Sequence, residues 1–485
     1  MINHEKIQKS IGDEKMKIKA LILSASLLIV MFFLPVAKAE EAGGAFIDPD
    51  LSQVLVDAVK PVEVIITFKN EEKVSPKSLQ LLKDVGITKG ITFNKLPIAG
   101  ALATKGQINK LVTGENILSI YLNKTLQYEN EEGTELTGVD KVRTNETIRS
   151  LNGGLPVSGK GIGVLINDSG VDGTHKDLQF GQHLVQNVLG ATNLHAIDTL
   201  LPVSYIENVL NTDNNSGHGT HVAGIVGGTG AMSGGKYEGA APGSNLIGYG
   251  SGAGLAMLDT IGGFDYALTH QQAYNIRVVT NSWGDTSDSG TAFDPFNPIN
   301  VATKKLYDRG ITTVFSAGNS GPGESTISGN YKKAPWVVTV AAGDMSRNLA
   351  DFSSRGKKGF GGMVTVDGQT WMWEDSPTVT SPGVNIISTR VLAPIPLLGA
   401  ADDVQFIPPA YIPYYTTMSG TSMAAPHVAG IIALMLDADM ELSPAEIKSI
   451  LKSTATPMTG YETWETGSGY VNAFGAIERV FHIGQ

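Results

Sequence analysis

One stretch near the C-terminus constrains the fold more than any other part of the chain. Residues 419–422 form a turn of small residues that leads straight into an apolar helix extending to Leu436. Ser422 falls in the first turn of that helix, where free N–H groups and the positive end of the helix dipole favour negative charge. Its hydroxyl could act as a nucleophile if another segment supplied a base and a group to orient it. The alternative is a serine that only caps the helix.

Length and charge bound the class of protein. A chain of 485 residues is long enough for a large core and at least one smaller domain. Its 57 glycines indicate many tight turns, as catalytic α/β folds often need. The net charge of −11 argues against a nucleic-acid partner.

The N-terminus has the pattern of an export signal. Lys15, Lys17 and Lys19 precede an apolar run over residues 20–36, which ends in the cleavage pattern at residues 37–39. We therefore expect residues 1–39 to be a secretory signal peptide and the mature protein to be extracellular. An uncleaved membrane anchor is the alternative, although the run is slightly short for a bilayer span. Because the chain has no cysteine, its stability must come from packing and bound ions and not from disulfides.

Residues 40–137 differ from the rest, being richer in Lys and Glu and poorer in Gly. Their pattern predicts strands at 62–68, 98–103 and 117–122 and helices at 78–83 and 104–111, in an order close to β-α-β-β-α-β. The acidic segment 129–135 has the composition of an exposed, cleavable linker. This predicts a small α+β domain joined by that linker to a larger one.

Asp168 ends an apolar strand over residues 161–168 and precedes a glycine turn. In open α/β sheets, functional groups gather outside the carboxyl ends of parallel strands, which is where Asp168 would lie. Asp172 and Asp177 lie close by, and composition does not choose among the three. An aspartate that only shapes the turn is the alternative.

His218 opens a predicted helix of small residues over 218–226 and is expected to be exposed at its start. Histidine titrates near neutrality, so it can accept a proton from a hydroxyl and return it to a leaving group. His218 and His221 could instead bind a metal, but no third ligand is spaced for zinc.

Together these three segments resemble the signatures of the subtilisin-like serine proteases, in that family's order of Asp, His and Ser. The resemblance runs from about Val139 to Phe481, and the upstream domain is similar to the family's inhibitory propeptide. It implies a three-layer α/β catalytic domain at 138–485 with a mostly parallel sheet, after a propeptide at 40–137. It also implies Ser422 as nucleophile, His218 as general base and Asp168 as the residue that orients His218. A binding module that is never removed is the alternative to a propeptide.

Two further segments match motifs of the same family. Asn319 follows an apolar strand in Ala317-Gly318-Asn319, and the resemblance implies that it stabilises the oxyanion together with the N–H of Ser422. Residues 278–284 resemble the family's substrate-binding strand. Ser282 and Gly284 would keep that backbone approachable, and Trp283 would line a pocket or be a buried structural residue. Ala317 and Gly318 would form the second wall of the cleft.

Departures from the family pattern concern calcium and loops. Asp177 matches a family calcium ligand, but residues 228–239 offer poor oxygen ligands, so a structural calcium is in doubt. Segments 181–212, 357–377 and 392–414 have the length of insertions, and the aromatic residues around 371–373 and 411–415 are expected to shape the cleft rim.

We expect a monomeric endopeptidase that acts on proteins or peptides, is inhibited by its own propeptide and requires no cofactor for its chemistry. A catalytically inactive, peptide-binding relative is the alternative from another class. A processing enzyme with basic specificity would need acidic residues in the cleft, for which Asp285 and Glu324 are weak candidates.

Overall fold

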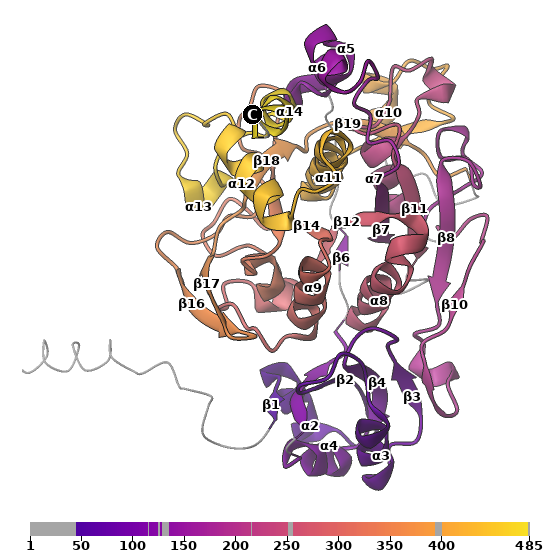
Figure 1. Ribbon diagram of the computed structural model, residues 1–485. Helices are drawn as coiled ribbons and strands as arrows, with labels where there is room; N and C mark the ends of the chain where they lie inside the picture. The colour runs from indigo at the N-terminus through magenta and orange to yellow at the C-terminus, as the bar shows by residue number, and fades with distance from the viewer. Residues whose placement is uncertain are drawn as a thin grey trace, which may run out of the picture.

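The computed structural model describes residues 45–114, 116–124, 127–128, 135–214, 216–250, 256–392 and 400–483. The predicted signal peptide and residues 129–134 of the predicted linker lie outside the described residues. Two β-sheets organise the described part, one of six strands in a small N-terminal domain and one of eight strands in a large domain (Figure 1).

The N-terminal domain has one sheet covered by helices. Its elements are β1 (Phe46–Ile47), α2 (Pro49–Asp57), β2 (Val62–Phe68), α3 (Pro76–Asp84), β3 (Gly90–Thr92), β4 (Ile98–Ala103), α4 (Lys105–Val112) and β5 (Ile117–Leu122). The strand order is β1-β5-β2-β4-β3-β9, and the sixth strand, β9 (Leu200–Pro202), comes from the large domain. Ser75 and Thr104 cap α3 and α4 through their side chains. From β2 to β5 the order is β-α-β-β-α-β, as the sequence predicts, whereas β1 and α2 were not predicted.

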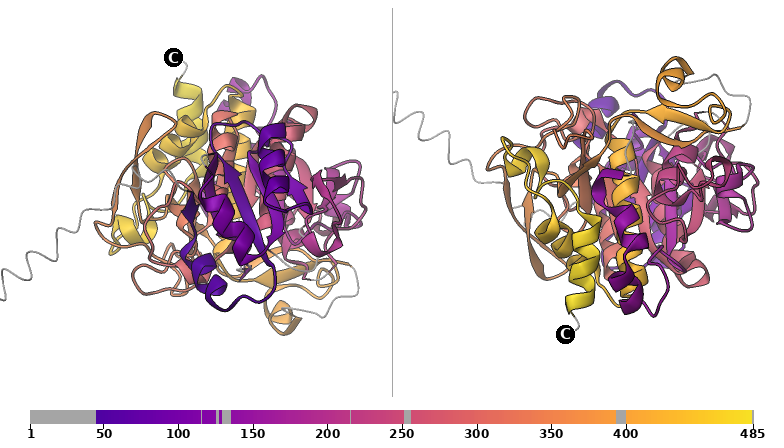
Figure 2. Two further views of the ribbon diagram at one scale, coloured as in Figure 1. Left: turned by 90° about the horizontal axis from the view of Figure 1, so that it is seen from below. Right: turned by 90° about the horizontal axis from the view of Figure 1, so that it is seen from above.

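The two faces of the N-terminal sheet belong to two different cores. Val64, Ile66 and Phe68 pack with α2, α3 and α4 into a core of this domain. Ile65, on the opposite face of β2, belongs to a core shared with the large domain. Gly100 marks the closest approach, because a Cβ there would lie 2.6 Å from Leu258 of α8 (Met257–Tyr274). Figure 2 (left) shows the N-terminal domain lying across the underside of the large domain.

The large domain has the predicted three layers. Its sheet runs β10-β8-β11-β7-β12-β14-β15-β18, and every neighbouring pair is parallel except β10 with β8. The strands are β7 (Gly163–Asp168), β8 (Leu184–Gly190), β10 (Tyr205–Ile206), β11 (Asn245–Gly250), β12 (Ile276–Asn281), β14 (Thr312–Ser316), β15 (Val338–Gly343) and β18 (Val379–Pro382).

Helices cover both faces of this sheet. One face carries α7 (His218–Gly227), α11 (Thr421–Ala438), α12 (Pro444–Thr454) and α14 (Ala473–Ile483), and the other carries α8 and α9 (Pro298–Asp308). Near α14 lie α5 (Val139–Thr144) and α6 (Glu146–Leu151), as the view from above shows (Figure 2, right). Among the described residues, the remaining α-helices are α10 (Ala400–Phe406) and α13 (Thr463–Thr466).

Helix α11 is the centre of the large domain. It is apolar and long enough to cross a membrane by length and composition, but 89% of it is buried inside the fold. It packs against α7 and against β12, β14, β15 and β18. This burial holds the start of α11, with Ser422, at a fixed place above the sheet.

The aromatic residues of the predicted insertion at 357–377 pack against neighbouring aromatic residues. In the hairpin β16 (Gly361–Val366) and β17 (Gln369–Glu374), Trp371 packs edge-on against Trp336 and Tyr307, and Trp373 is buried against Phe293. These contacts do not support the expectation that Trp371 and Trp373 shape the cleft rim, because both rings pack against neighbouring aromatic residues. The same expectation for residues 411–415 stays a prediction.

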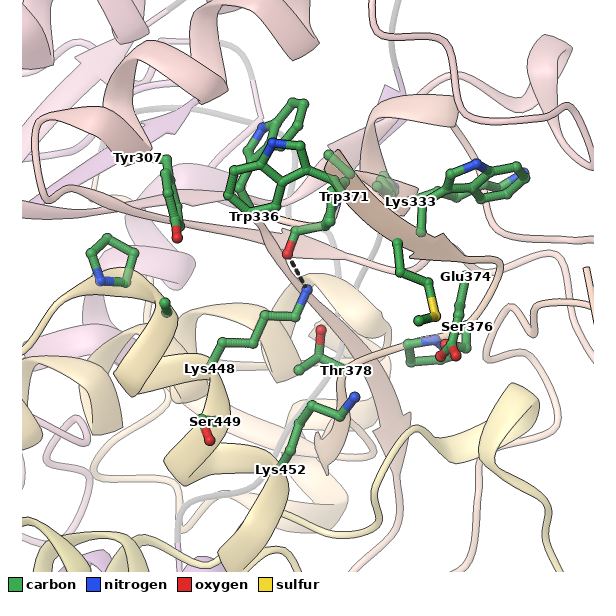
Figure 3. A pocket seen from close by; sticks show the side chains of 18 of the residues that line it. Tyr307, Lys333, Trp336, Trp371, Glu374, Ser376, Thr378, Lys448, Ser449 and Lys452 are labelled. Atoms are coloured by element: carbon green, nitrogen blue, oxygen red, sulfur yellow. Dashed lines mark hydrogen bonds between the residues drawn. The ribbon is translucent and has the colours of Figure 1, made fainter. Parts of the chain in front are cut away.

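Between this hairpin and α12 lies a pocket of about 620 Å³, none of whose lining residues is a predicted site residue (Figure 3). In it Lys448 donates to the carbonyl oxygens of Pro335 and Val337, at 2.9 and 2.7 Å. Burial lowers the pKa of Lys448 to about 7. We interpret Lys448 as the residue that ties α12 to the loop preceding β15.

Candidate active site

Asp168 and His218 meet at the carboxyl end of β7, an interior strand of the large sheet. Asp168 is the last residue of β7, and His218 is the first residue of α7. The His218 Nδ1 atom lies 2.6 Å from Asp168 Oδ1, which also accepts the N–H of Ser169 at 2.8 Å. Gly219 permits this approach, because a Cβ there would lie 2.2 Å from the carbonyl oxygen of Gly170. The ring of His218 is only 3% exposed, so the expectation of an exposed histidine is wrong.

A second buried aspartate, which was not predicted, fixes the start of α7. Asp213 accepts hydrogen bonds from the Ser169 hydroxyl, the Gly217 N–H and both the N–H and hydroxyl of Thr220. Ser169 in turn accepts the N–H of Gly219 at 2.8 Å. Burial raises the pKa of Asp213, against the lowering effect of these donors. The network joins β7 to α7 and so fixes the distance between Asp168 and His218.

Ser422 lies at the second residue of α11, as predicted. Its hydroxyl donates to the carbonyl oxygen of Ser282 at 3.1 Å, and the Ser282 hydroxyl donates back to the carbonyl oxygen of Ser422 at 2.7 Å. The reciprocal pair joins the start of α11 to the predicted substrate-binding strand. Gly420, which precedes the helix at φ +151°, provides a turn that other residues rarely adopt.

Asn319 is oriented by the same turn. Its Oδ1 atom accepts the N–H of Thr421 at 3.0 Å and the Thr421 hydroxyl at 3.1 Å. The Thr421 hydroxyl also accepts the N–H of Gly318 at 3.0 Å. Because Oδ1 accepts these two hydrogen bonds from Thr421, the NH₂ group is the part of the amide that can face a substrate. Asn319 is thus bound to the residue that directly precedes Ser422.

The strand that the resemblance assigns to substrate binding is paired with another strand of the same chain. β13 (Trp283–Gly284) pairs antiparallel with β6 (Gln127–Tyr128), with Trp283 opposite Tyr128. Gly284 has no room for a side chain, because a Cβ there would lie 2.4 Å from Ser328 Oγ. The expectation that a substrate peptide adds to residues 282–284 by main-chain hydrogen bonds stays a prediction.

The side chain of Trp283 has a structural role. It is completely buried, and its Nε1 atom donates to the carbonyl oxygen of Asn167 at 2.8 Å. It packs among Phe264, Phe315 and Tyr331. The expectation that this side chain lines a pocket is therefore wrong, and only its backbone is available to a substrate.

Backbone hydrogen bonds hold Ala317 and Gly318, the predicted second wall of the cleft. Ala317 donates to Val340 and accepts from Ser328, and Gly318 accepts from Ser354. Gly318 adopts φ +121°, a conformation that favours glycine. The assignment of Ala317 and Gly318 to the cleft stays a prediction.

His221, the possible partner of His218 in a metal site, has another role. Its Nε2 atom lies 3.2 Å from the carbonyl oxygen of Ile386 and 3.1 Å from that of Thr416, so it acts as a donor. Burial lowers the pKa of His221 to about 3, which keeps the ring neutral. Nε2 is thus not available to a metal, and the described residues contain no group of three or more His, Cys, Asp or Glu side chains that could hold one.

The residues around Asp177 do not fit a bound calcium. Asp177 Oδ1 accepts the N–H of Met232 at 3.0 Å, and Oδ2 accepts the hydroxyl of Tyr415 at 2.6 Å. The carboxylate of the 228–239 loop, Glu238, pairs with Arg143 at 3.2 Å. Calcium requires six to eight oxygen ligands, whereas here protein donors occupy both oxygens of Asp177. The prediction of Asp177 as a metal ligand is therefore not supported by its contacts.

This arrangement predicts stability that does not depend on calcium at Asp177. In a chain carrying Ser422→Ala to prevent self-digestion, the midpoint of thermal unfolding should be the same with calcium and with chelator. Tyr415→Phe should lower the free energy of unfolding by about 1–3 kcal/mol, because a buried carboxylate oxygen loses its donor. Tyr411→Phe is the matched control. A calcium-dependent midpoint that Asp177→Asn abolishes would contradict this account.

The candidates for basic specificity are not equally placed. Asp285 is buried and accepts from Ser287, and its other oxygen lies 3.6 Å from Lys124 of the N-terminal domain. Glu324 is exposed. Neither observation assigns a basic preference to the cleft.

The imidazole of His218 is held by a carboxylate, and its helix α7 packs against α11, whose first turn carries Ser422. A serine, a histidine and an aspartate are the catalytic residues of many serine hydrolases. The family model described as the subtilase family matches residues 159–475, more than half of the chain, so the chain belongs to this family and is a subtilisin-like serine endopeptidase. Relatives include serine protease AprX of Bacillus subtilis (strain 168), 29% identical over 403 residues covering 79% of this chain and 80% of the relative. Subtilisin DY of Bacillus licheniformis is 30% identical over 327 residues, covering 66% of this chain and 92% of the relative.

Solved structures agree with the fold. The crystal structure of fervidolysin from Fervidobacterium pennivorans matches 90% of this chain and 64% of that chain, with a TM-score of 0.56 and 20% identity. Sphericase matches 70% of this chain and 99% of that chain, with a TM-score of 0.50 and 25% identity. The subtilisin-like architecture of the large domain is thereby confirmed.

Proposed function

We propose that this subtilase is a secreted endopeptidase, made as a precursor that its own N-terminal domain inhibits. The observation that carries the proposal is the pairing of β6 with β13, because it puts main chain that precedes the linker next to Ser282, which contacts Ser422. Residues 1–39 would direct export, and residues 40–137 would be the propeptide.

In the proposed reaction, the Ser422 hydroxyl attacks the carbonyl carbon of the scissile peptide bond. His218 accepts the hydroxyl proton and then gives it to the leaving amine, which leaves an acyl-enzyme. Asp168 holds the Nδ1–H tautomer and stabilises the imidazolium ion that forms. A water molecule then hydrolyses the ester with His218 again as base. Nothing in these steps requires a metal or an organic cofactor.

Two donors would stabilise the negative oxygen of the tetrahedral intermediate. They are the amide NH₂ of Asn319 and the backbone N–H of Ser422, which lies in the first turn of α11, where helix N–H groups have no intrahelical acceptor. The Thr421 contacts to Asn319 Oδ1 support this role, since they fix the amide before a substrate arrives.

Substrates would be extended segments of proteins or peptides that add to β13, with Ser282 and Gly284 contributing backbone and Ala317 and Gly318 the opposite wall. The enzyme would act as a monomer. In the precursor, β6 occupies β13, so a substrate cannot bind there until the N-terminal domain leaves. Release would need cleavage in the linker that follows Tyr128.

Self-cleavage of the intact chain tests this function. The purified precursor should split into two fragments, and the N-terminus of the large fragment should fall between residues 129 and 139. The Ser422→Ala chain should remain whole, and the rate of the first cut should not depend on protein concentration if the chain cuts itself. Cleavage of Ser422→Ala at the same bond and rate would contradict the proposal.

A further inference from the structure

A segment of the large domain reaches across to the N-terminal domain. Residues 191–203 leave the end of β8, contact the N-terminal domain and return as β10 (Figure 1). The sequence singled out 181–212 as an insertion of unassigned role. We call residues 191–203 the docking arm, because its described contacts include main-chain, apolar and charged contacts with the N-terminal domain.

The main chain of the docking arm extends the N-terminal sheet. β9 pairs parallel with β3, with Gly90 opposite Leu200 and Thr92 opposite Pro202. Two more hydrogen bonds flank the pair, from the Gly90 N–H to the Thr199 carbonyl at 3.3 Å and from the Val203 N–H to the Thr92 carbonyl at 2.6 Å. β3 would otherwise be an edge strand with unpaired backbone groups, which another strand can cover.

The apolar side chains of the docking arm divide between two surfaces. Leu200 packs against the core of the N-terminal domain, and a Cβ on Gly90 would lie 3.0 Å from its Cδ1 atom. Val203 is buried in the shared core with Ile91. Leu201 points away from both cores and is 51% exposed. Leu200 and Leu201 are therefore neighbours on one strand with opposite surroundings.

Charged pairs lie along the same segment. Asp198 pairs with Lys89 at 3.1 Å, and His195 lies 3.0 Å from Glu63. The side chains of His195, Lys89 and Asp198 are more than half exposed. Each pair therefore contributes little binding free energy alone, but the charges of the two surfaces are complementary.

We propose that the docking arm is a second binding site for the N-terminal domain, separate from the cleft, which retains that domain after the linker is cut. This rests on the proposed function. Cutting the linker frees one end of the N-terminal domain but leaves the β3–β9 pair intact. The shared core also survives the cut, and the arm adds to it. The cleaved enzyme therefore stays inhibited until the domain leaves or is itself digested, and the arm lengthens the delay.

The test compares two neighbouring leucines in the full chain. After the linker is cut, we would measure the share of the N-terminal fragment that co-elutes with the large fragment, and the delay before a short peptide substrate is hydrolysed. Leu200→Asp should shorten the delay about tenfold, because a charged group in an apolar contact weakens the docked state. Leu201→Asp should behave as wild type. Once the fragment is gone, all three proteins should turn over the peptide equally.

A second series covers the case in which Leu200→Asp does not fold. Asp198→Lys changes only an exposed pair, so it should shorten the delay by a few-fold, and Lys89→Asp in the same chain should restore it. The docking arm would be overturned if Leu200→Asp showed the same delay as Leu201→Asp and Asp198→Lys left the delay unchanged. A wild-type chain that hydrolyses peptide fully with the fragment still bound would instead refute inhibition itself.

The strand pair can also be tested without any cleavage. In the uncut Ser422→Ala chain, the amide hydrogen of Val203 should exchange slowly, because it is donated to Thr92. Leu200→Asp should speed this exchange at least tenfold while leaving the exchange of β12 unchanged. Exchange of Val203 at the rate of an exposed loop in the Ser422→Ala chain would refute the pairing.

Discussion

Asp168→Asn is expected to lower kcat about 10⁴-fold at neutral pH, as the same change does in another serine protease triad. The physical reason lies in the 2.6 Å contact between Asp168 Oδ1 and His218 Nδ1. A carboxylate only accepts hydrogen bonds, so it fixes the proton on Nδ1 and leaves Nε2 free to act as base. An asparagine amide can donate to Nδ1 instead, which favours the tautomer that cannot accept a proton from Ser422. Steady-state kinetics on a peptide substrate would measure the loss.

The controls for this prediction are the two neighbouring aspartates that the sequence alone does not separate from Asp168. Asp172 accepts from Thr174 and Leu392, and Asp177 accepts from Met232 and Tyr415, so neither contacts His218 by these bonds. Asp172→Asn and Asp177→Asn should lower stability but keep kcat within a few-fold of wild type. A larger loss of kcat in either of them than in Asp168→Asn would show that Asp168 is not the orienting residue.

Asn319→Ala is expected to lower kcat by about 10²–10³ with little change in KM; that range comes from the corresponding donor of subtilisin, a relative. The amide is held ready by two hydrogen bonds from Thr421. The negative oxygen exists only in the tetrahedral intermediate and the transition states around it, so the loss should fall on turnover and not on binding.

The neighbouring serine provides the control. Ser320 is exposed, and only its backbone N–H contacts Ser354 among the described hydrogen bonds. Ser320→Ala should therefore leave kcat unchanged. If Asn319→Ala also kept kcat within threefold of wild type, another group would have to stabilise the oxyanion.

Much of the fold and of the site was predictable from local sequence. Alternation in residues 62–68 and the cap at Thr104 predicted elements that depend on near neighbours, and the structure confirms them. The strand end at Asp168, the helix start at His218 and the first turn at Ser422 are also local features. The three segments follow the order Asp, His, Ser of the subtilisin-like serine proteases, and this order implied that they share one site. No single segment implied that.

What could not be predicted depends on contacts between distant segments. The side chain of Trp283 faces the core because Asn167, far earlier in the chain, accepts its N–H. Tyr415 donates to Asp177 although it lies more than two hundred residues later in the chain. The sequence around Asp177 therefore could not predict this hydrogen bond. The pairing of β9 with β3 has the same origin, since a three-residue strand carries almost no pattern of its own.

The central claim is that Ser422 is the nucleophile, and covalent labelling tests it most directly. A fluorophosphonate added to the chain after linker cleavage should attach to one residue, which mass spectrometry of the digested protein would identify as Ser422. His218→Ala should abolish the labelling, because the hydroxyl then lacks its base. A protein that hydrolyses peptides while Ser422 remains unlabelled, or that carries the label on a different serine, would contradict the account.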